Sequence, residues 1–261
     1  MTQPHNPTRL QSLDELEFSA VLSDLDGIVY RGDDAIAGAV ARFRSWHDQG
    51  LPYCFITNNA EKSADDFASK IIGLGIPCTP YQVVSAAEVT LAYVSARYAP
   101  GTPVYVVGTP LFKNRVEAAG FVLASTAAQV VLVALDRQFD YSMMKAALRN
   151  VLGGAELIGT NPDLIRPVDD GFEPGAGAIA HSIATAAGVS PKFIGKPSPD
   201  IIHLAMERLG VQAQSAIMLG DQLDTDILAA QRAGVRGVFV ETGVPINPRS
   251  AVKTEYLLQQ L

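Results

Sequence analysis

The chain has 261 residues, of which 48% are hydrophobic and 18% charged, and its formal net charge is −7. This composition excludes a disordered chain, no apolar run approaches the roughly 20 residues that cross a bilayer, and the absence of a Lys/Arg block argues against nucleic acid as a partner. The polar start lacks the apolar stretch of about 7 to 15 residues of a secretory signal, so we expect a cytoplasmic protein.

Strands and helices alternate in the first third of the chain. In chain order the pattern predicts a strand at 20–23, a helix at 36–49, a strand at 52–57 and a helix at 63–74. The two helices end before Gly50 and Gly75, and glycine is a common helix stop. This alternation is typical of a parallel sheet with helices on its faces.

The same alternation restarts in the middle block, after Gly101. It predicts a strand at 103–108, an amphipathic stretch over 114–119, a strand at 130–135, a helix at 141–152 and a strand at 156–160. This block can form a small α/β layer of its own, and a loop over 163–177 follows it.

The last third resembles the first third resumed. It predicts helices at 179–187, 199–209 and 225–233 and strands at 192–195, 216–220 and 237–241. The final segment, 254–261, reads equally as a strand or a helical turn. We therefore predict a parallel α/β core formed by residues 1–86 and 180–261 and interrupted by an inserted domain at 87–179.

Two aspartates end the first predicted strand. Asp24 and Asp26 would share one face of an extended chain, and Gly27 permits a sharp turn beyond the sheet edge. Open α/β sheets bind ligands at the carboxyl ends of their strands. The alternative interpretation is an ordinary turn with solvated side chains.

A second acidic group, Asp221, Asp224 and Asp226, follows the strand AIMLG. If the two strand ends are neighbours, Asp24, Asp26 and Asp221 repel one another, and their pKa values rise unless a cation lies among them. Carboxylate oxygens without a nearby His or Cys suit Mg²⁺. The sequence therefore implies a magnesium site, while Asp224 itself fits a solvated loop.

Two further strand ends carry groups that can bind phosphate. The strand at 52–57 leads into Thr57, Asn58 and Asn59, which supply a hydroxyl and backbone N–H groups but also fit an ordinary turn. The strand at 192–195 leads into Lys196, a cation between apolar strand and predicted helix.

Four motifs thus follow strands in a fixed order: DLDGIVY, TNN, GKPSPDII and GDQLDTDI. They resemble the four motifs of the haloacid dehalogenase (HAD) superfamily, and the chain resembles its class IIA, the NagD-like or p-nitrophenylphosphatase-like branch. The segments LDRQFDY and GTNPD of the middle block resemble the cap of that branch. The resemblance implies a Rossmann-like core with an inserted C2-type α/β cap.

The resemblance also implies an enzyme, a Mg²⁺-dependent phosphatase that hydrolyses a small phosphate monoester. Asp24 would be the nucleophile that forms an aspartyl-phosphate, and Asp26 the general acid that protonates the leaving oxygen and then activates water. The acid two residues after the nucleophile favours phosphoester chemistry, because dehalogenases of the superfamily lack it.

Phosphate and metal binding are assigned in the same way. Thr57 and Lys196 would bind the transferring phosphoryl group, and Asn58 would help through the loop backbone.

The resemblance also implies the metal ligands. Mg²⁺ would be held by Asp24, by the backbone carbonyl of Asp26 and by Asp221, with Asp226 supporting these ligands.

Substrate choice would lie in the cap. Arg166, in the loop after GTNPD, is a candidate for gripping a second anionic group, although it also fits a solvated loop, and Arg137 fits a structural ion pair within the cap. The resemblance allows a homodimer through the cap and leaves the metabolite open. The alternative function is a non-catalytic protein that binds a phosphorylated metabolite.

Overall fold

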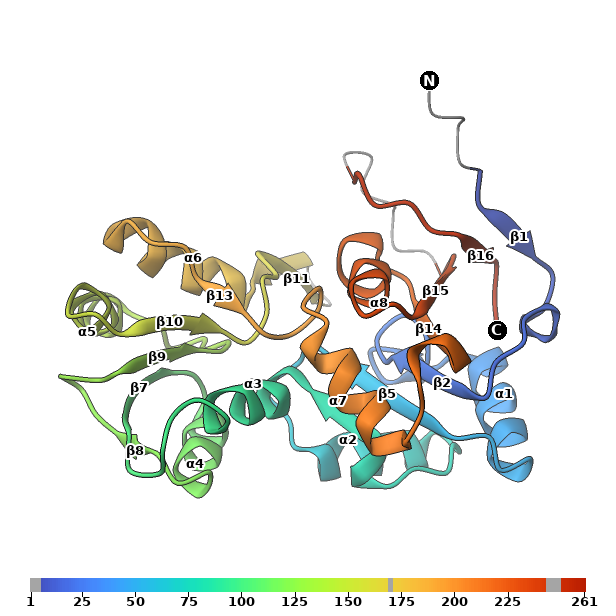
Figure 1. Cartoon of the computed structure of the whole chain (residues 1–261), viewed down its shortest axis with the longest axis horizontal. Coiled ribbons are helices and arrows are strands. Elements are labelled where there is room, and N and C mark those ends of the chain that lie inside the picture. The colour runs from blue at the N-terminus through green and yellow to red at the C-terminus, as the bar shows by residue number, and fades with distance from the viewer. Residues whose placement is uncertain (1–5, 169–170, 243–249) are drawn as a thin grey trace. The chain divides into compact units, whose positions relative to one another are not determined.

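A computed structural model describes residues 6–168, 171–242 and 250–261 (Figure 1). The chain forms two compact units. The first unit comprises Met1–Thr57, Ser63–Val84 and Lys196–Leu261, and the second comprises Asn58–Lys62 and Ser85–Gly195. Both are α/β units, which confirms the predicted fold class.

The first unit is built on a seven-stranded sheet with the order β1-β16-β15-β14-β2-β5-β6. Its strands are β1 (Thr8–Leu10), β2 (Ala20–Asp24), β5 (Tyr53–Thr57), β6 (Val83–Ser85), β14 (Ala216–Gly220), β15 (Arg236–Val240) and β16 (Tyr256–Leu258). The neighbours from β1 to β5 in this order all pair in parallel. The central strands β2, β5 and β14 are buried at every residue, as expected for strands covered on both faces.

Helices and short turns complete this unit. They are α1 (Ala37–Asp48), α2 (Ala64–Gly73), α7 (Asp200–Leu209) and α8 (Leu228–Arg232), with 3₁₀ turns at Leu13–Glu15, Pro80–Gln82 and Ala213–Ser215 and the small antiparallel pair β3 (Tyr30–Arg31) and β4 (Asp34–Ala35). One core cluster joins the apolar faces of α1 and α2 to the sheet, and it includes Phe43 and Phe55, whose ring centroids lie 4.9 Å apart.

The second unit has a five-stranded sheet with the order β13-β10-β9-β7-β8. Its strands are β7 (Pro103–Val107), β8 (Val122–Leu123), β9 (Val130–Val133), β10 (Glu156–Gly159) and β13 (Lys192–Phe193), and all four pairs are parallel. Its helices are α3 (Ala86–Ser95), α4 (Pro110–Ala118), α5 (Tyr141–Leu152) and α6 (Ala176–Ala187). A separate antiparallel hairpin joins β11 (Ile165–Val168) to β12 (Gly171–Pro174).

The second boundary between the units differs from the predicted one. We expected the core to resume at residue 180, but the second unit continues to Gly195 and includes α6 and β13. The reason is packing, because β13 pairs with β10, and Ile179 and Ile183 of α6 belong to the same apolar cluster as Val131 of β9. The first boundary lies between Val84 and Ser85, two residues before the predicted one, and the segment 58–62 also belongs to the second unit.

Other elements correct individual predictions. The predicted loop over 163–177 contains the β11–β12 hairpin and the start of α6. The predicted helix over 225–233 begins as a π-helical turn at Leu223–Ile227 and continues as α8. The final segment is resolved in favour of a strand, β16. None of the helices in the described part of the chain has the length and apolarity needed to cross a membrane.

Candidate active site

Three neighbouring strands of the first unit end in the predicted site residues. β2 lies between β14 and β5, and these strands run in parallel, so their carboxyl ends lie along one edge (Figure 1). Asp24 is the last residue of β2, Thr57 is the last residue of β5, and Asp221 directly follows β14. The order of strands therefore gathers groups that are up to 197 positions apart in the chain.

A buried lysine joins two of the carboxylates. Lys196 Nζ donates to Asp24 Oδ1 at 2.6 Å and forms an ion pair with Asp226 Oδ1 at 2.7 Å. The lysine is 2% exposed and Asp226 is fully buried, so water cannot replace these contacts. No sequence pattern indicated this ion pair, since the resemblance implies only a supporting role for Asp226 near the metal ligands.

Two glycines make room for the carboxylates. Gly27 has φ of +84°, and a Cβ atom there would lie 1.9 Å from Asp221 Oδ2. Gly220 ends β14, where an added Cβ would lie 2.1 Å from the Cβ of Asp226. The turn after β2 and the turn after β14 can therefore approach these aspartates only with glycine at both positions.

Burial shifts the ionisation of these groups. Desolvation raises the pKa of Asp24 well above its usual value, and the Lys196 ammonium opposes that shift. Burial and the neighbouring Asp226 raise the pKa of Asp221 to about 7. Burial alone would lower the pKa of Lys196, but Asp226 and Asp24 outweigh it and raise that pKa. The cluster thus holds more negative groups than one lysine can balance.

The carboxylates suit a divalent cation. Asp24, Asp221 and Asp226 each offer an oxygen, and these oxygens lie within 4.8 Å of one another. Asp221 Oδ1 is buried and accepts no hydrogen bond from the described residues, so a lone pair faces the cluster unused. An all-oxygen set of this kind fits Mg²⁺. The site thus brings together Asp24 and Asp221, as predicted for the metal, and adds Asp226 to them.

The other predicted site residues differ in burial and in unit. Asp26 is exposed, two residues after the buried Asp24, and takes part in a β-bridge with Tyr30. Thr57 is 2% exposed in the first unit. Asn58 belongs to the second unit, where its backbone oxygen accepts from Asn161 Nδ2 at 2.8 Å.

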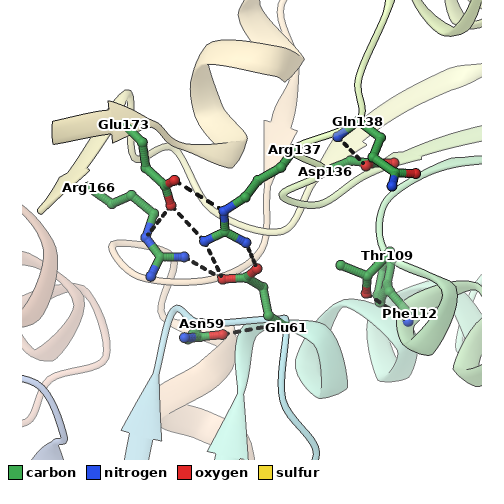
Figure 2. A network of polar contacts seen from close by, with 9 residues as sticks. All are labelled: Asn59, Glu61, Thr109, Phe112, Asp136, Arg137, Gln138, Arg166 and Glu173. Atoms are coloured by element: carbon green, nitrogen blue, oxygen red, sulfur yellow. Dashed lines mark hydrogen bonds and ion pairs between the residues drawn. The ribbon is translucent and has the colours of Figure 1, made fainter. Parts of the chain in front are cut away.

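Arg166 and Arg137 lie together in the second unit (Figure 2). Arg137 forms an ion pair with Glu173 at 2.7 Å, which confirms the predicted structural ion pair. The Arg137 side chain is 51% exposed, so this contact remains partly solvated. Arg166 donates to Glu61 and lies 3.2 Å from Glu173 Oε1. Both guanidiniums are thus matched by carboxylates, and no sequence pattern indicated Glu61 or Glu173 as their partners.

Comparisons with known proteins agree on one family. The profile of haloacid dehalogenase-like hydrolases matches residues 21–122, and a second profile, of HAD-hydrolase-like proteins, matches residues 193–258. The chain is 37% identical to the acid sugar phosphatase of Staphylococcus aureus strain MRSA252 over 229 residues, which is 87% of this chain and 88% of that protein.

Solved structures extend the likeness to three dimensions. A double mutant of the thermostable NPPase from Geobacillus stearothermophilus is 34% identical with a TM-score of 0.87, over 94% of this chain and 96% of that chain. NagD from the E. coli K-12 strain is 28% identical with a TM-score of 0.85, over 94% and 97%. The chain therefore belongs to the haloacid dehalogenase-like hydrolases, as a phosphatase of their NagD-like branch.

Proposed function

We propose that this enzyme hydrolyses a small sugar phosphate or a related phosphate monoester, with Mg²⁺ as cofactor and an aspartyl-phosphate formed on Asp24. The observation that carries the proposal is the buried Asp24 carboxylate at the end of the central strand, 2.6 Å from Lys196 Nζ and beside Asp221. A carboxylate with that burial is poorly solvated and is held in one orientation, as a nucleophile requires.

Asp24 would attack phosphorus, and the bond from phosphorus to the sugar oxygen would break. Lys196 orients the attacking carboxylate and would offset the charge of the phosphoryl oxygens, to which the hydroxyl of Thr57 would also donate. A bound Mg²⁺, held by Asp24, Asp221 and the backbone carbonyl of Asp26, would supply further positive charge at those oxygens. Asp226 keeps the lysine in place through its ion pair.

Asp26 would transfer the protons. Its exposed side chain can exchange protons with solvent, whereas Asp24 is buried and would attack phosphorus. In the first step the Asp26 carboxyl would protonate the leaving oxygen, and in the second its carboxylate would take a proton from the water that attacks the phosphoaspartate. One side chain would thus act as acid and then as base.

Two observations favour a substrate whose far end is uncharged. The Staphylococcus relative bears the name acid sugar phosphatase. In addition, the Arg166 guanidinium contacts both Glu61 and Glu173, so its charge is already balanced and it offers little attraction to a second anionic group. We assign the second unit the role of specificity cap and allow a homodimer through it, which the oligomeric state in solution would test.

The first experiment measures phosphate release from p-nitrophenyl phosphate and from a panel of sugar phosphates, with Mg²⁺ and with EDTA. We expect turnover that requires Mg²⁺ and that falls by at least about 10³-fold in Asp24→Asn, because a neutral amide cannot replace the nucleophile. Asp48→Asn, the same change at an exposed residue that ends α1 and lies outside the four motifs, serves as the control. Full turnover by Asp24→Asn would refute the mechanism, and phosphate binding without turnover would favour the non-catalytic alternative.

A further inference from the structure

Four charged side chains form a closed ring within the second unit, which we call the charge ring: Glu61, Arg137, Arg166 and Glu173 (Figure 2). Each arginine contacts both glutamates. Arg137 donates to Glu173 through Nη2 at 2.7 Å and Nε at 3.1 Å, and Arg166 Nε lies 3.2 Å from Glu173 Oε1. Both guanidiniums also donate to Glu61. Two positive and two negative groups leave the ring neutral.

The charge ring joins three segments that are far apart in the sequence. Arg166 and Glu173 face each other across the β11–β12 hairpin. Arg137 comes from the turn after β9, and Glu61 comes from the segment 58–62. The side chain of Asn59 accepts from the backbone N–H of Glu61 at 2.8 Å, which fixes the turn that presents this glutamate (Figure 2).

The hairpin depends on contacts of this kind. An isolated two-stranded hairpin is marginally stable in water. Its apolar side chains contribute little packing, since Ile165 is 62% exposed and Phe172 is 73% exposed. Charge-assisted, partly bidentate hydrogen bonds from arginine are stronger than neutral ones and fix orientation. The charge ring therefore supplies attachment that burial of apolar surface does not.

The segment 58–62 is held at both ends. At its start, the Asn58 backbone oxygen accepts from Asn161 Nδ2 at 2.8 Å, and Asn58 Nδ2 donates to Asp163 Oδ2 at 3.2 Å. Near its end, Glu61 closes the charge ring. The residue just before this segment is Thr57, the last residue of β5. Within one to four positions of Thr57, the chain is thus anchored to Asn161, Asp163 and Arg166.

We propose that Glu61 is a positioning residue for phosphoryl transfer, because it fixes the chain after Thr57 to the β11–β12 hairpin by way of the charge ring. The inference rests on the proposed function, in which the Thr57 hydroxyl donates to the phosphoryl group. A misplacement of about 1 Å in such a group can lower a rate by up to 100-fold. Glu61 itself touches no reacting atom.

Hydrogen exchange on the full chain tests the attachment. Glu61→Gln removes the negative charge that both arginines share, so the backbone amides of residues 164–166, 168 and 171–173 should exchange at least about tenfold faster, while those of β2 and β14 keep their rates. The matched control is Glu117→Gln, which removes the charge of an exposed residue of α4 outside the charge ring. Unchanged exchange in the hairpin of Glu61→Gln would overturn the inference.

Kinetics test the positioning role. With p-nitrophenyl phosphate we expect Glu61→Gln to lower kcat by about tenfold with KM changed less than twofold, Glu61→Asp to recover part of kcat, and Arg166→Gln combined with Glu61→Gln to be no worse than the single variants. Strictly additive losses, or faster exchange with unchanged kcat, would overturn the positioning role and leave the proposed function standing. A wild-type chain without turnover would overturn both.

Discussion

At the scale of single residues, the site depends on charged side chains that pack so closely against two turns that only glycine fits there. Lys196 is buried between Asp24 and Asp226, and Asp221 lies against the turn at Gly27. Burial raises the pKa of both Asp24 and Asp221, and a cation bound among these groups would lower both pKa values and keep the carboxylates ionised. Desolvation thus sets the ionisation of the site carboxylates, and close packing fixes their positions.

Substitution of Gly27 tests this close packing. Gly27→Ala should destabilise the chain by about 1–2 kcal/mol, because alanine is strained at φ of +84°. It should also lower kcat by about 100-fold, because the new Cβ displaces the Asp221 carboxylate. Urea unfolding and p-nitrophenyl phosphate turnover measure the two effects.

Gly50→Ala is the matched control for that variant. Gly50 has φ of +71°, but no other atom lies within 4 Å of an added Cβ. It should therefore show a similar loss of stability with unchanged kcat. Equal loss of activity in both variants would contradict the argument, since backbone strain alone would then explain it.

The thiol of Cys78 gives a test that depends on pH. Burial raises the pKa of this thiol from 9.0 to about 12. The neutral thiol is favoured in the folded chain, so its contribution to stability is complete below pH 9 and is lost as the pH rises toward 12. At pH 8 we expect a chromogenic disulfide reagent to react only slowly with the native chain. After unfolding in urea, the same reagent should react rapidly with both cysteines. Rapid reaction of a thiol in the native chain that disappears in Cys78→Ser would contradict the burial of Cys78.

At the scale of elements, helix starts and strand ends position the chemistry. α2 begins at the point where the chain returns to the first unit, and Ser63 forms a capping box with Asp66 there, accepting from its backbone N–H at 3.1 Å. The parallel strands β14, β2 and β5 end together and place Asp221, Asp24 and Thr57 along one edge. Within residues 57–66, the end of β5 positions Thr57, and the capping box positions the start of α2.

Removal of the cap should show how much α2 depends on it. Ser63→Ala should lower the free energy of unfolding by about 1 kcal/mol, whereas Ser63→Asn should retain most of it, because asparagine also caps helices well. Urea unfolding of both variants measures the difference. An equal loss in both would mean that packing of Phe67 and Ile71, and not the cap, sets the stability of this helix start.

At the scale of the whole molecule, each of the two units contains a hydrophobic cluster formed by its own residues. Phe43 belongs to the cluster of the first unit, and Ile183 belongs to that of the second. Each side chain is fully buried, and each cluster is confined to residues of its own unit. This division predicts that damage to one core is felt mainly in that unit.

Core truncations with hydrogen-exchange readout test that division. Phe43→Ala should cost about 3–5 kcal/mol and Ile183→Ala about 2–5 kcal/mol, because each leaves a cavity. We expect Phe43→Ala to reduce amide protection mainly in β2 and β5 and Ile183→Ala mainly in β9 and β10. A uniform loss of protection across both sheets in either variant would show that the chain unfolds as one cooperative unit.

Local sequence patterns were enough to predict the family, the parallel α/β architecture and the strand ends at Asp24, Thr57 and Asp221, whereas the strand predicted before Lys196 is β13 of the second unit. These follow from local periodicity, from glycine stops and from motifs whose residues are close in the chain. Long-range packing, which no local pattern specifies, places α6 and β13 in the second unit, pairs Asp226 with Lys196 and joins Glu61 to Arg166. The physical reason is the same in each case, because these contacts join residues far apart in sequence, and a helix-strand alternation shared by both sheets does not specify which partner a strand or a charge will meet.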